Sequence, residues 1–533
     1  MIGFHIDMNT AQFQGEYLET WLRELAHRGY DTIIWEIENN VHWETCPECC
    51  SPDAFTKNEF KKLLDLCRKL KLEPIPLFQT LGHCEYVLKH EKYSHLKELP
   101  KSLQQYCPMN PDLRPFLTRW IEEYLDLFGE VKYFHLGADE AWSLGRCETC
   151  REYVNAHSLS ELYMRHMNFL AHPLISRGIT PIIWADMVLT HPEAMDLLDR
   201  RIMLFDWMYD IYHGQGKVWV WGQEFKTKNE LSPKTLEVYG KYLFPRGDEP
   251  GREPETFFNS DALADHGFRV VNCPGSSSFG DNVFSPRNWY HMTNTFDSLH
   301  KGRNAPLEGT VLTSWTIHLF PWELQLACID MPGYVYRHPD ATIEMYQKAF
   351  VADRFGSDDD TTFMKACGLL SKPSLFTYTA SLGLDKDGRH IPSDHVEKEL
   401  ARLKKENKLQ SELENSRQRL AEYTQALALF ETFTARAIRG KDILTWWHLA
   451  ARNLINRARA SIWLLENFME HQPDKKESAA ILTELRRLRE ETAVKYQSIL
   501  KPTRLAEYLH WLYEAVETAL EKQWATADPD SPA

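Results

Sequence analysis

Between residue 1 and about residue 355, short apolar runs alternate with amphipathic stretches of helical length. The runs are rich in β-branched and aromatic residues, which is typical of buried strands. Strands separated by helices predict a parallel sheet, because parallel neighbours need long crossover connections. Eight such units in this length indicate a (β/α)₈ TIM barrel with insertions. The predicted strands are residues 2–7, 32–37, 73–79, 131–137, 180–186, 201–207, 269–273 and 310–315.

Polar or aromatic residues recur at the ends of these predicted strands, and this favours a barrel over a doubly wound sheet. A doubly wound sheet would gather them at one crevice and would usually carry a Gly-rich phosphate loop, which we do not find. In a barrel, all the strand ends meet at one mouth. The long connection at about 210–267, rich in Gly, Pro, Trp and charge, is expected to be a loop over that mouth.

The pattern changes near residue 357. Apolar residues then recur at helical spacing in 394–437, 440–470, 475–499 and 502–524, which predicts a helical bundle. We therefore divide the chain into a (β/α)₈ barrel at 1–357, a linker and connecting helix at 358–393, and an α-helical C-terminal domain at 394–533. That domain carries no chemical motif, so it is expected either to support the barrel or to form a homodimer.

Charge and hydropathy exclude several classes of partner. A net charge of −15 argues against nucleic acid and against an anionic membrane surface. No apolar run approaches transmembrane length, and the first strand begins too close to Met1 to leave room for a signal peptide. We expect a cytoplasmic protein whose 11 cysteines are thiols or metal ligands rather than a disulfide framework.

The fourth predicted strand ends in His135-Leu-Gly-Ala-Asp-Glu140. Neighbouring side chains of an extended strand point to opposite faces, so Asp139 and Glu140 can share one site only if the chain bends at or just after Gly137. Alternatively, the two acids simply open the next helix, whose amino-terminal dipole favours negative charge. The strand before them favours a catalytic pair at the barrel mouth.

This stretch resembles the His-x-Gly-Gly-Asp-Glu signature of family 20 glycoside hydrolases, the β-N-acetylhexosaminidases, with Ala138 replacing the second glycine. Pro76-Leu-Phe-Gln-Thr-Leu-Gly-His83, the following Tyr86-Val-Leu-Lys-His90, and Pro181-Ile-Ile-Trp-Ala-Asp186 extend the resemblance toward the hexosaminidase D branch. The resemblance covers roughly the first two-thirds of the chain and leaves the last third unexplained.

The resemblance implies retaining exo-hydrolysis of terminal β-linked GlcNAc or GalNAc, without a catalytic cofactor. In this family the substrate's own 2-acetamido group is the nucleophile and forms an oxazolinium intermediate. Glu140 would then be the general acid and base, and Asp139 would accept the acetamide N–H and stabilise developing positive charge.

The resemblance also implies a set of residues around the sugar. Trp184, Trp207 and Trp315 end three strands and could build an acetamido pocket, although a single Trp in an apolar run is usually core. Tyr209 and Tyr212 compete for the acetamide carbonyl, and Asp186 would either bind a sugar hydroxyl or orient Asp139. The full expected set is His83, Trp184, Asp186, Asp206, Trp207, Tyr209, Trp315 and Asp7.

His83 is expected in a polar relay beside the acid, completed by Glu36 or Glu38, with His135 supporting the site from the strand body. Two features depart from the family pattern. No Arg follows the first strand, so the contact to O3 and O4 would move to Asp7 or Asn9. The familiar Trp-x-Glu reads Trp315-Thr-Ile317, with Glu323 as a distant substitute, so the choice between GlcNAc and GalNAc stays open.

Two Cys-x₂-Cys pairs follow the second and fourth strands and therefore lie on the same face of the predicted barrel. Such pairs are a zinc signal when they meet. We predict either a structural zinc site formed by Cys46, Cys49, Cys147 and Cys150, or unrelated reduced thiols.

The most concrete hypothesis is thus a cytoplasmic β-N-acetylhexosaminidase acting on glycans or glycosides with a terminal N-acetylhexosamine. The alternatives are a glycosidase for another amino sugar and a non-catalytic carbohydrate-binding or scaffold protein. Either carboxyl buried in a salt bridge far from any pocket would favour the scaffold.

Overall fold

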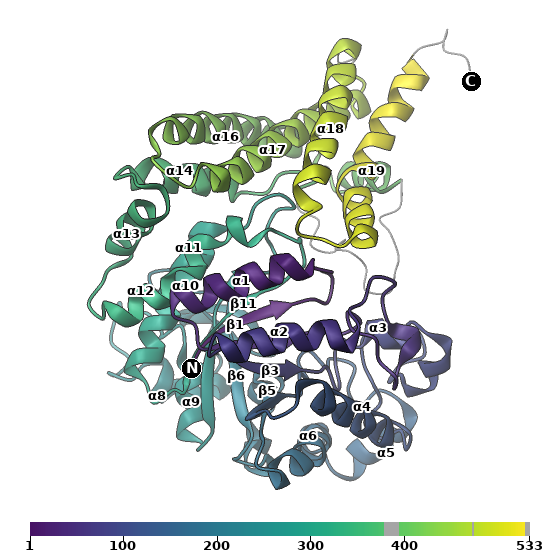
Figure 1. The fold of residues 1–533 in the computed structure, drawn as a ribbon, viewed down its shortest axis with the longest axis vertical. Coiled ribbons are helices and arrows are strands. Elements are labelled where there is room, and N and C mark those ends of the chain that lie inside the picture. Colours follow the sequence, from purple (N-terminus) through teal and green to yellow (C-terminus); the bar gives the residue numbers. More distant parts are fainter. Residues whose placement is uncertain (378–393, 472–473, 528–533) are drawn as a thin grey trace.

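The computed structural model describes residues 1–377, 394–471 and 474–527. A closed barrel lies at one end of the molecule, and a layer of long helices covers one side of it (Figure 1). Residues 378–393, which form the second part of the predicted linker, lie outside the described residues. Among the residues that the structure does describe, no helix combines the length and apolar character needed to cross a membrane.

Eight parallel strands close into the barrel, which confirms the predicted fold class. Strand β1 pairs with β2 on one side and with β11 on the other, so the sheet has no free edge. The strands are, in order, β1 (Ile2–Asp7), β2 (Thr32–Glu36), β3 (Glu73–Leu77), β4 (Tyr133–His135), β5 (Thr180–Trp184), β6 (Met203–Trp207), β9 (Arg269–Cys273) and β11 (Gly309–Ser314).

Side chains alternate between the barrel interior and the helix layer. Ile34, Ile182 and Phe205 pack inside the barrel, whereas their neighbours Ile33 and Leu204 join the larger core beneath the helices. This alternation has a period of two, so it also fixes which strand-end residues face the mouth. The short strand β10 (Gly275–Ser277) adds to β11 at the rim.

Amphipathic helices cover the barrel, and their ends follow ordinary capping chemistry. In α2, Thr56 and Glu59 form a reciprocal capping box at the amino terminus. The main covering helices are α1 (Gly15–Arg28), α2 (Lys57–Lys69), α4 (Leu113–Phe128), α6 (Leu159–Ser176), α9 (Phe258–Asp265), α10 (Asn288–Asn304), α12 (Met331–Arg337) and α13 (Ile343–Phe355).

The connection at 210–267 is more ordered than the sequence predicted. It contains an antiparallel hairpin, β7 (Lys217–Val220) with β8 (Glu224–Thr227), then α8 (Pro233–Leu243) and the crossover helix α9. Val218, Leu243 and Phe258 bury one another in a small core of their own. This insertion is therefore a packed subdomain rather than a loop.

The C-terminal third is helical, as predicted. Its helices are α14 (Asp360–Leu370), α15 (His395–Lys405), α16 (Leu409–Arg436), α17 (Lys441–Phe468), α18 (Lys475–Tyr496) and α19 (Pro502–Ala527). The predicted helix at 394–437 is divided in two near Asn407, whose φ is 56°. Helices α16 to α19 lie together above the barrel in Figure 1.

Backbone hydrogen bonds join this helical layer to the barrel. The amide of Gln14 donates to the carbonyl of Ile499 at 2.8 Å, and the amide of Lys501 donates to Gln12 at 2.7 Å. The Tyr508 hydroxyl donates to the carbonyl of His318 at 3.3 Å. Gln12 and His318 follow the carboxyl ends of β1 and β11, so the helices dock beside the mouth.

Candidate active site

The chain bends in the loop after β4, as expected if Asp139 and Glu140 are to share one site. Gly137, Ala138 and Glu140 all have positive φ, at 63°, 73° and 49°. Left-handed backbone at residues other than Gly costs of order 1–3 kcal/mol and persists only where the surroundings enforce it. Here Ala138 donates its amide to Gln79 Oε1 at 3.2 Å and accepts the Tyr163 hydroxyl at its carbonyl, also at 3.2 Å. The strain therefore serves to aim the acid pair.

His83 brings the two carboxylates together. Its Nε2 lies 3.3 Å from Asp139 Oδ2 and 3.2 Å from Glu140 Oε2. The Asp139 side chain is 7% exposed and that of Glu140 is 36% exposed, so Glu140 faces the opening. Gly82 permits the close approach, because a Cβ there would lie 2.1 Å from the Asp139 carbonyl oxygen.

Asp186 supports the acid loop from β5. It begins α7 (Asp186–Thr190), and its Oδ2 accepts the amide of Glu140 at 2.8 Å. Burial raises the pKa of Asp186 well above its ordinary value, and the negative charge of Asp139 adds to the rise. Of the two predicted roles, this placement favours orientation of the acid loop over contact with a sugar hydroxyl.

A buried polar network runs beneath the loop. The imidazole Nε2 of His5 lies 2.9 Å from Glu36 Oε2, and Gln79 donates to Glu36 Oε1 at 3.0 Å. Glu36 thus reaches the acid loop through Gln79. His5 was not predicted as a site residue from the sequence, and its inward position two residues before the end of β1 was the available signal.

His135 occupies the supporting position that was expected. Its Nδ1 accepts the amide of Gly137 at 2.9 Å, and its ring lies 4.5 Å from that of Trp184. Burial lowers the pKa of His135 well below its ordinary value, so the ring is neutral at neutral pH. It holds the bend from below and does not face the opening.

Aromatic rings line one side of the mouth. Trp315 lies between His5, at a centroid distance of 4.7 Å, and Tyr209, at 6.3 Å. Trp207 stacks on Tyr209 at 5.1 Å and meets Trp221 at 4.4 Å. Trp221 comes from the insertion and was not predicted. Stacked and edge-on rings of this kind form a rigid apolar wall.

Trp184 and Tyr212 are not part of this aromatic wall. Trp184 is fully buried in the barrel interior, 5.8 Å from Trp315, and therefore forms the floor. Tyr212 packs edge-on against Tyr290 instead. The Tyr209 hydroxyl faces Thr313 and Trp315 but makes no hydrogen bond of good geometry within the described part of the chain. Tyr209 is thus the better candidate for a substrate contact.

Asp206 corrects the sequence prediction. It alternates with the inward-facing Phe205 and Trp207, so its carboxylate points to the helix layer, where the Ser260 hydroxyl of α9 donates to it at 2.6 Å. Burial raises the pKa of Asp206 to about 7. Its role is to join β6 to α9, and it is not part of the mouth.

Asp7 faces inward but its oxygens are already engaged. Oδ2 accepts the amide and hydroxyl of Thr316 at 2.8 and 3.0 Å, and Oδ1 accepts the amide of Asn9 at 2.8 Å. It therefore joins the rims of β1 and β11 rather than offering a free carboxylate to a sugar. Glu323, the distant substitute, accepts the Tyr17 hydroxyl of α1 at 3.0 Å.

The cysteines also correct the prediction. Cys147 and Cys150 meet Cys107 and Glu98, and the four ligand atoms lie within 4.8 Å of one another. Cys46 and Cys49 lie in their own turn, where the Cys49 thiol donates to the Cys46 carbonyl at 3.0 Å. The predicted set of four cysteines is therefore wrong, because the two Cys-x₂-Cys pairs do not share a cluster.

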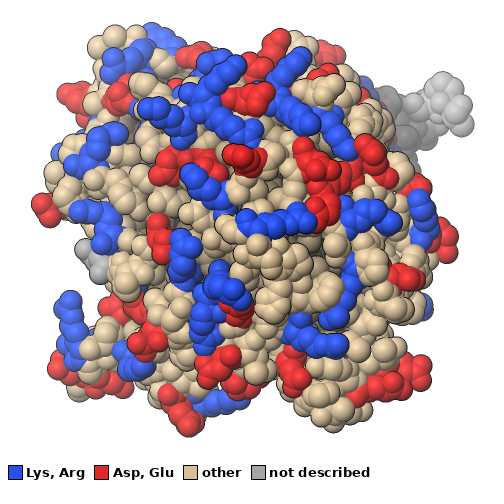
Figure 2. Space-filling view, turned by 60° about the horizontal axis from the view of Figure 1, so that its bottom comes forward, with Lys and Arg blue, Asp and Glu red and all other residues tan. Residues whose placement is uncertain are grey.

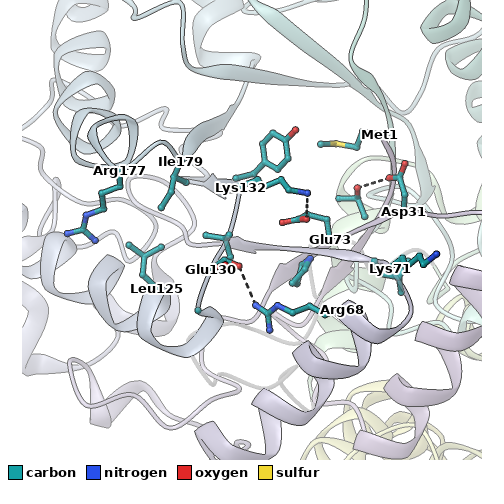
Figure 3. Close-up of a pocket in the computed structure, with 16 residues that line it drawn as sticks. Met1, Asp31, Arg68, Lys71, Glu73, Leu125, Glu130, Lys132, Arg177 and Ile179 are labelled. Atoms are coloured by element: carbon teal, nitrogen blue, oxygen red, sulfur yellow. Dashed lines mark hydrogen bonds and ion pairs between the residues drawn. The ribbon is translucent and has the colours of Figure 1, made fainter.

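A depression of about 1080 Å³ opens at the opposite end of the barrel (Figure 3). Its charged side chains are largely paired, for example Lys132 with Glu73 at 2.9 Å and Arg68 with the carbonyl of Glu130 at 3.5 Å. The amino-terminal face of a TIM barrel serves stability rather than catalysis.

On the face in Figure 2, acidic and basic side chains are interspersed and form no continuous basic surface.

Part of this chain is similar to known glycoside hydrolases. Residues 18–219 match the family model described as "Glycosyl hydrolase family 20, catalytic domain". Hexosaminidase D of Bos taurus is 29% identical over 239 residues, 41% of this chain and 69% of that protein. Hexosaminidase D of Homo sapiens is 29% identical over 194 residues, 36% of this chain and 40% of that protein.

Solved structures that align with this chain include the chitobiase of Flavobacterium johnsoniae, at 15% identity and a TM-score of 0.47, covering 97% of this chain and 78% of that one. Dispersin B aligns at 14% identity and a TM-score of 0.43, covering 63% and 98%. The family match and the closed barrel define the class: this chain is a glycoside hydrolase. The stretch that matches the catalytic domain of glycosyl hydrolase family 20 begins in α1 and extends into the insertion.

Proposed function

We propose that this chain is a retaining exo-β-N-acetylhexosaminidase that removes terminal β-linked GlcNAc or GalNAc by substrate-assisted catalysis. The observation that carries the proposal is the convergence of Asp139 and Glu140 on His83 Nε2, at 3.3 and 3.2 Å. The match to family 20 and the likeness to the two hexosaminidase D proteins support it.

In the first step, the acetamide carbonyl oxygen of the substrate attacks C1, and the bond from C1 to the leaving oxygen breaks. Glu140 gives its proton to that oxygen, while Asp139 accepts the acetamide N–H and stabilises the positive charge of the oxazolinium ring. In the second step, Glu140 removes a proton from water, which attacks C1 and reopens the ring. Two displacements at C1 give net retention.

The remaining residues position the acetamido group. Trp315, Tyr209 and Trp207 supply an apolar wall and Trp184 a floor, so the acetamide is held against C1, and the Tyr209 hydroxyl donates to its carbonyl. Holding the nucleophile in place lowers the entropic cost of the attack. His83 fixes the separation of the two carboxylates.

A second candidate function, hydrolysis of another amino sugar, is favoured by one observation. The carboxylates expected to grip the ring hydroxyls, Asp7 and Glu323, are engaged with Thr316 and Tyr17. The choice between GlcNAc and GalNAc is therefore left to the measurement below.

A cytoplasmic location and a homodimer formed through the helical layer stay predictions, and light scattering of the purified chain tests the latter.

The test compares wild type with Glu140→Gln on aryl β-GlcNAc and aryl β-GalNAc substrates. Removing the general acid should lower kcat/KM, which reports departure of the leaving group, at least about 100-fold on a poor leaving group and far less on a strongly acidic phenol, which leaves without a proton. Glu152→Gln, an exposed acid of α5 (Glu148–Ala156), is the control. Equal kcat/KM for Glu140→Gln and wild type on both sugars, with a poor leaving group, would refute the assignment.

A further inference from the structure

We propose that Glu98, Cys107, Cys147 and Cys150 form a structural zinc site that braces the two loops carrying His83 and Glu140. Three thiols and one carboxylate gather here, with all four ligand atoms within 4.8 Å of one another. Cysteine sulfur and carboxylate oxygen are both established zinc ligands, and structural zinc sites take four of them. The site is separate from the catalytic acids.

The spacing of the ligand atoms fits a coordination tetrahedron. Zn–S bonds of about 2.3 Å at tetrahedral angles place two sulfurs about 3.8 Å apart, and a sulfur and a carboxylate oxygen about 3.6 Å apart. Cys107 Sγ lies 3.5 Å from Cys147 Sγ and 3.6 Å from Cys150 Sγ. Cys150 Sγ lies 3.3 Å from Glu98 Oε2. Each of these three edges is within a few tenths of an ångström of the zinc value.

The same distances do not fit a disulfide. A disulfide requires a sulfur separation of about 2.0 Å between two specific partners. Cys107 instead stands at nearly equal distance from two sulfurs, which is the arrangement of ligands around a shared ion. A disulfide would also leave the buried Glu98 carboxylate, 1% exposed, facing sulfur without a cation.

Neighbouring groups already orient the ligands. Glu98 Oε1 accepts the amides of Arg146 and Cys147 at 2.7 and 2.9 Å, which leaves Oε2 facing the sulfurs. Cys147 caps the amino terminus of α5, and its sulfur accepts the amide of Cys150 at 3.3 Å. Amide donors and a helix amino terminus stabilise thiolate, the form that binds metal. Such outer contacts are a regular part of metal sites.

The cluster joins the segments that position the catalytic groups. Glu98 and Cys107 flank a short antiparallel bridge between Lys97 and Tyr106. Between these ligands, Gln105 Oε1 accepts the amide of Ser143 at 2.9 Å, and the Gln104 side chain donates to the Glu140 carbonyl at 3.4 Å. The Gln104 carbonyl also accepts the amide of Cys84, next to His83, at 2.9 Å. A zinc ion would therefore fix both active-site loops through one anchor.

The test measures metal content and needs no assay of hydrolysis. Full-length wild type purified without chelator should carry about one zinc per chain by elemental mass spectrometry. Cys107→Ser and Cys150→Ser should lose most of it, and Glu98→Gln, which keeps the shape of the side chain, should bind zinc at least about tenfold more weakly in chelator competition. Cys46→Ser is the matched control and should keep its zinc.

A second measurement avoids variants that fail to fold. Wild type stripped with chelator under reducing conditions and titrated with Co²⁺ should show thiolate-to-cobalt charge-transfer absorption and the visible bands of a tetrahedral site. The proposal is overturned by stripped wild type that gives neither signal, by folded Cys107→Ser and Cys150→Ser that keep full zinc, or by a Cys107 disulfide in non-reducing peptide mapping.

Discussion

At the scale of single residues, the mouth depends on Gly82 and His83, two neighbours with opposite requirements. Gly82 must have no side chain, because a Cβ would lie 2.1 Å from the backbone oxygen of Asp139. His83 must adopt a φ of 54°, which residues other than Gly rarely do, in order to reach both carboxylates. Gly82 and His83 thus let the turn after β3 hold the carboxylates of Asp139 and Glu140 at a fixed separation.

Gly82→Ala should therefore disturb the acid loop directly. The collision is with backbone rather than a flexible side chain, so we expect a loss of about 1–3 kcal/mol in the free energy of unfolding. Because a shift of about 1 Å in a reacting group can cost about 100-fold, kcat should fall by a similar factor. Gly368→Ala, in α14 with open space around it, is the control. Chemical denaturation and steady-state kinetics measure both effects, and a fully active Gly82→Ala would contradict this geometry.

His83→Asn isolates the histidine from its backbone conformation, because Asn tolerates positive φ. Loss of the imidazole from between Asp139 and Glu140 should lower kcat about 100-fold, comparable with removal of one preorganised donor, while Tm stays within a few degrees of wild type. His172→Asn, at a histidine 59% exposed on α6, should change neither. A wild-type kcat for His83→Asn would show that the contacts of 3.2 and 3.3 Å have no role in catalysis.

At the scale of elements, the two-residue alternation of β6 decides the role of Asp206. The carboxyl is buried against Ser260 of α9, and burial raises its pKa to about 7 from an ordinary value of 3.8. The folded chain then keeps a proton that the unfolded chain releases. This group stabilises the fold fully below pH 4, and the contribution is lost as the pH rises toward 7.

Asp206→Asn removes that pH dependence. Each unit of pKa difference corresponds to about 1.4 kcal/mol, so the variant should gain up to about 4 kcal/mol relative to wild type between pH 4 and pH 7. Urea denaturation of both proteins across this range measures the difference, and any penalty that does not depend on pH cancels from it. Parallel stability curves would contradict the raised pKa.

The elements also show what sequence patterns reveal and what they hide. The eight barrel strands were predictable because each is a short buried run of mainly apolar, β-branched or aromatic residues. Strand β4 ends at His135, two residues early, since the chain bends at Gly137. The bend itself followed from two adjacent acids that must share one site. The hairpin of β7 and β8 was hidden by the Gly, Pro and charge around it.

Cooperation between distant segments was harder to predict. Cys107 belongs to no Cys-x₂-Cys pair, and the bridge between Lys97 and Tyr106 places it beside Glu98, near Cys147. A search for Cys-x₂-Cys pairs therefore joins Cys147 and Cys150 to the wrong partners, Cys46 and Cys49. The position of Asp206 was not predicted for a local reason. Its likeness to a family residue did not specify which face of β6 it occupies.

At the scale of the whole molecule, the helical layer and the barrel share a buried anchor. Arg457 of α17 is 6% exposed; it donates to the carbonyls of Phe376, at 2.9 Å, and of Leu512 in α19. Its guanidinium also lies 5.3 Å from the ring of Phe284, in the segment after β10. Burial lowers the pKa of Arg457 to about 10, so it remains a cation at neutral pH.

Arg457→Met should leave these carbonyls without their donor, at a cost of about 2–4 kcal/mol in the free energy of unfolding. Wild type should show a single calorimetric transition, because the barrel and the helices are joined at this anchor and by the backbone bonds of Gln14 and Lys501. Arg417→Met, at an arginine 55% exposed on α16, should cost under about 1 kcal/mol. Two well-separated transitions in wild type would contradict the shared anchor.

The molecule as a whole is proposed to use its substrate as the nucleophile, and this is the central claim. The most direct test is the kcat/KM of wild type on aryl β-glycosides whose 2-acetyl group carries none, one, two or three fluorines. Each fluorine withdraws electrons from the carbonyl oxygen that attacks C1, so kcat/KM should fall steeply along the series. A rate independent of fluorination would contradict the account, because an enzyme carboxylate or water would then be the nucleophile.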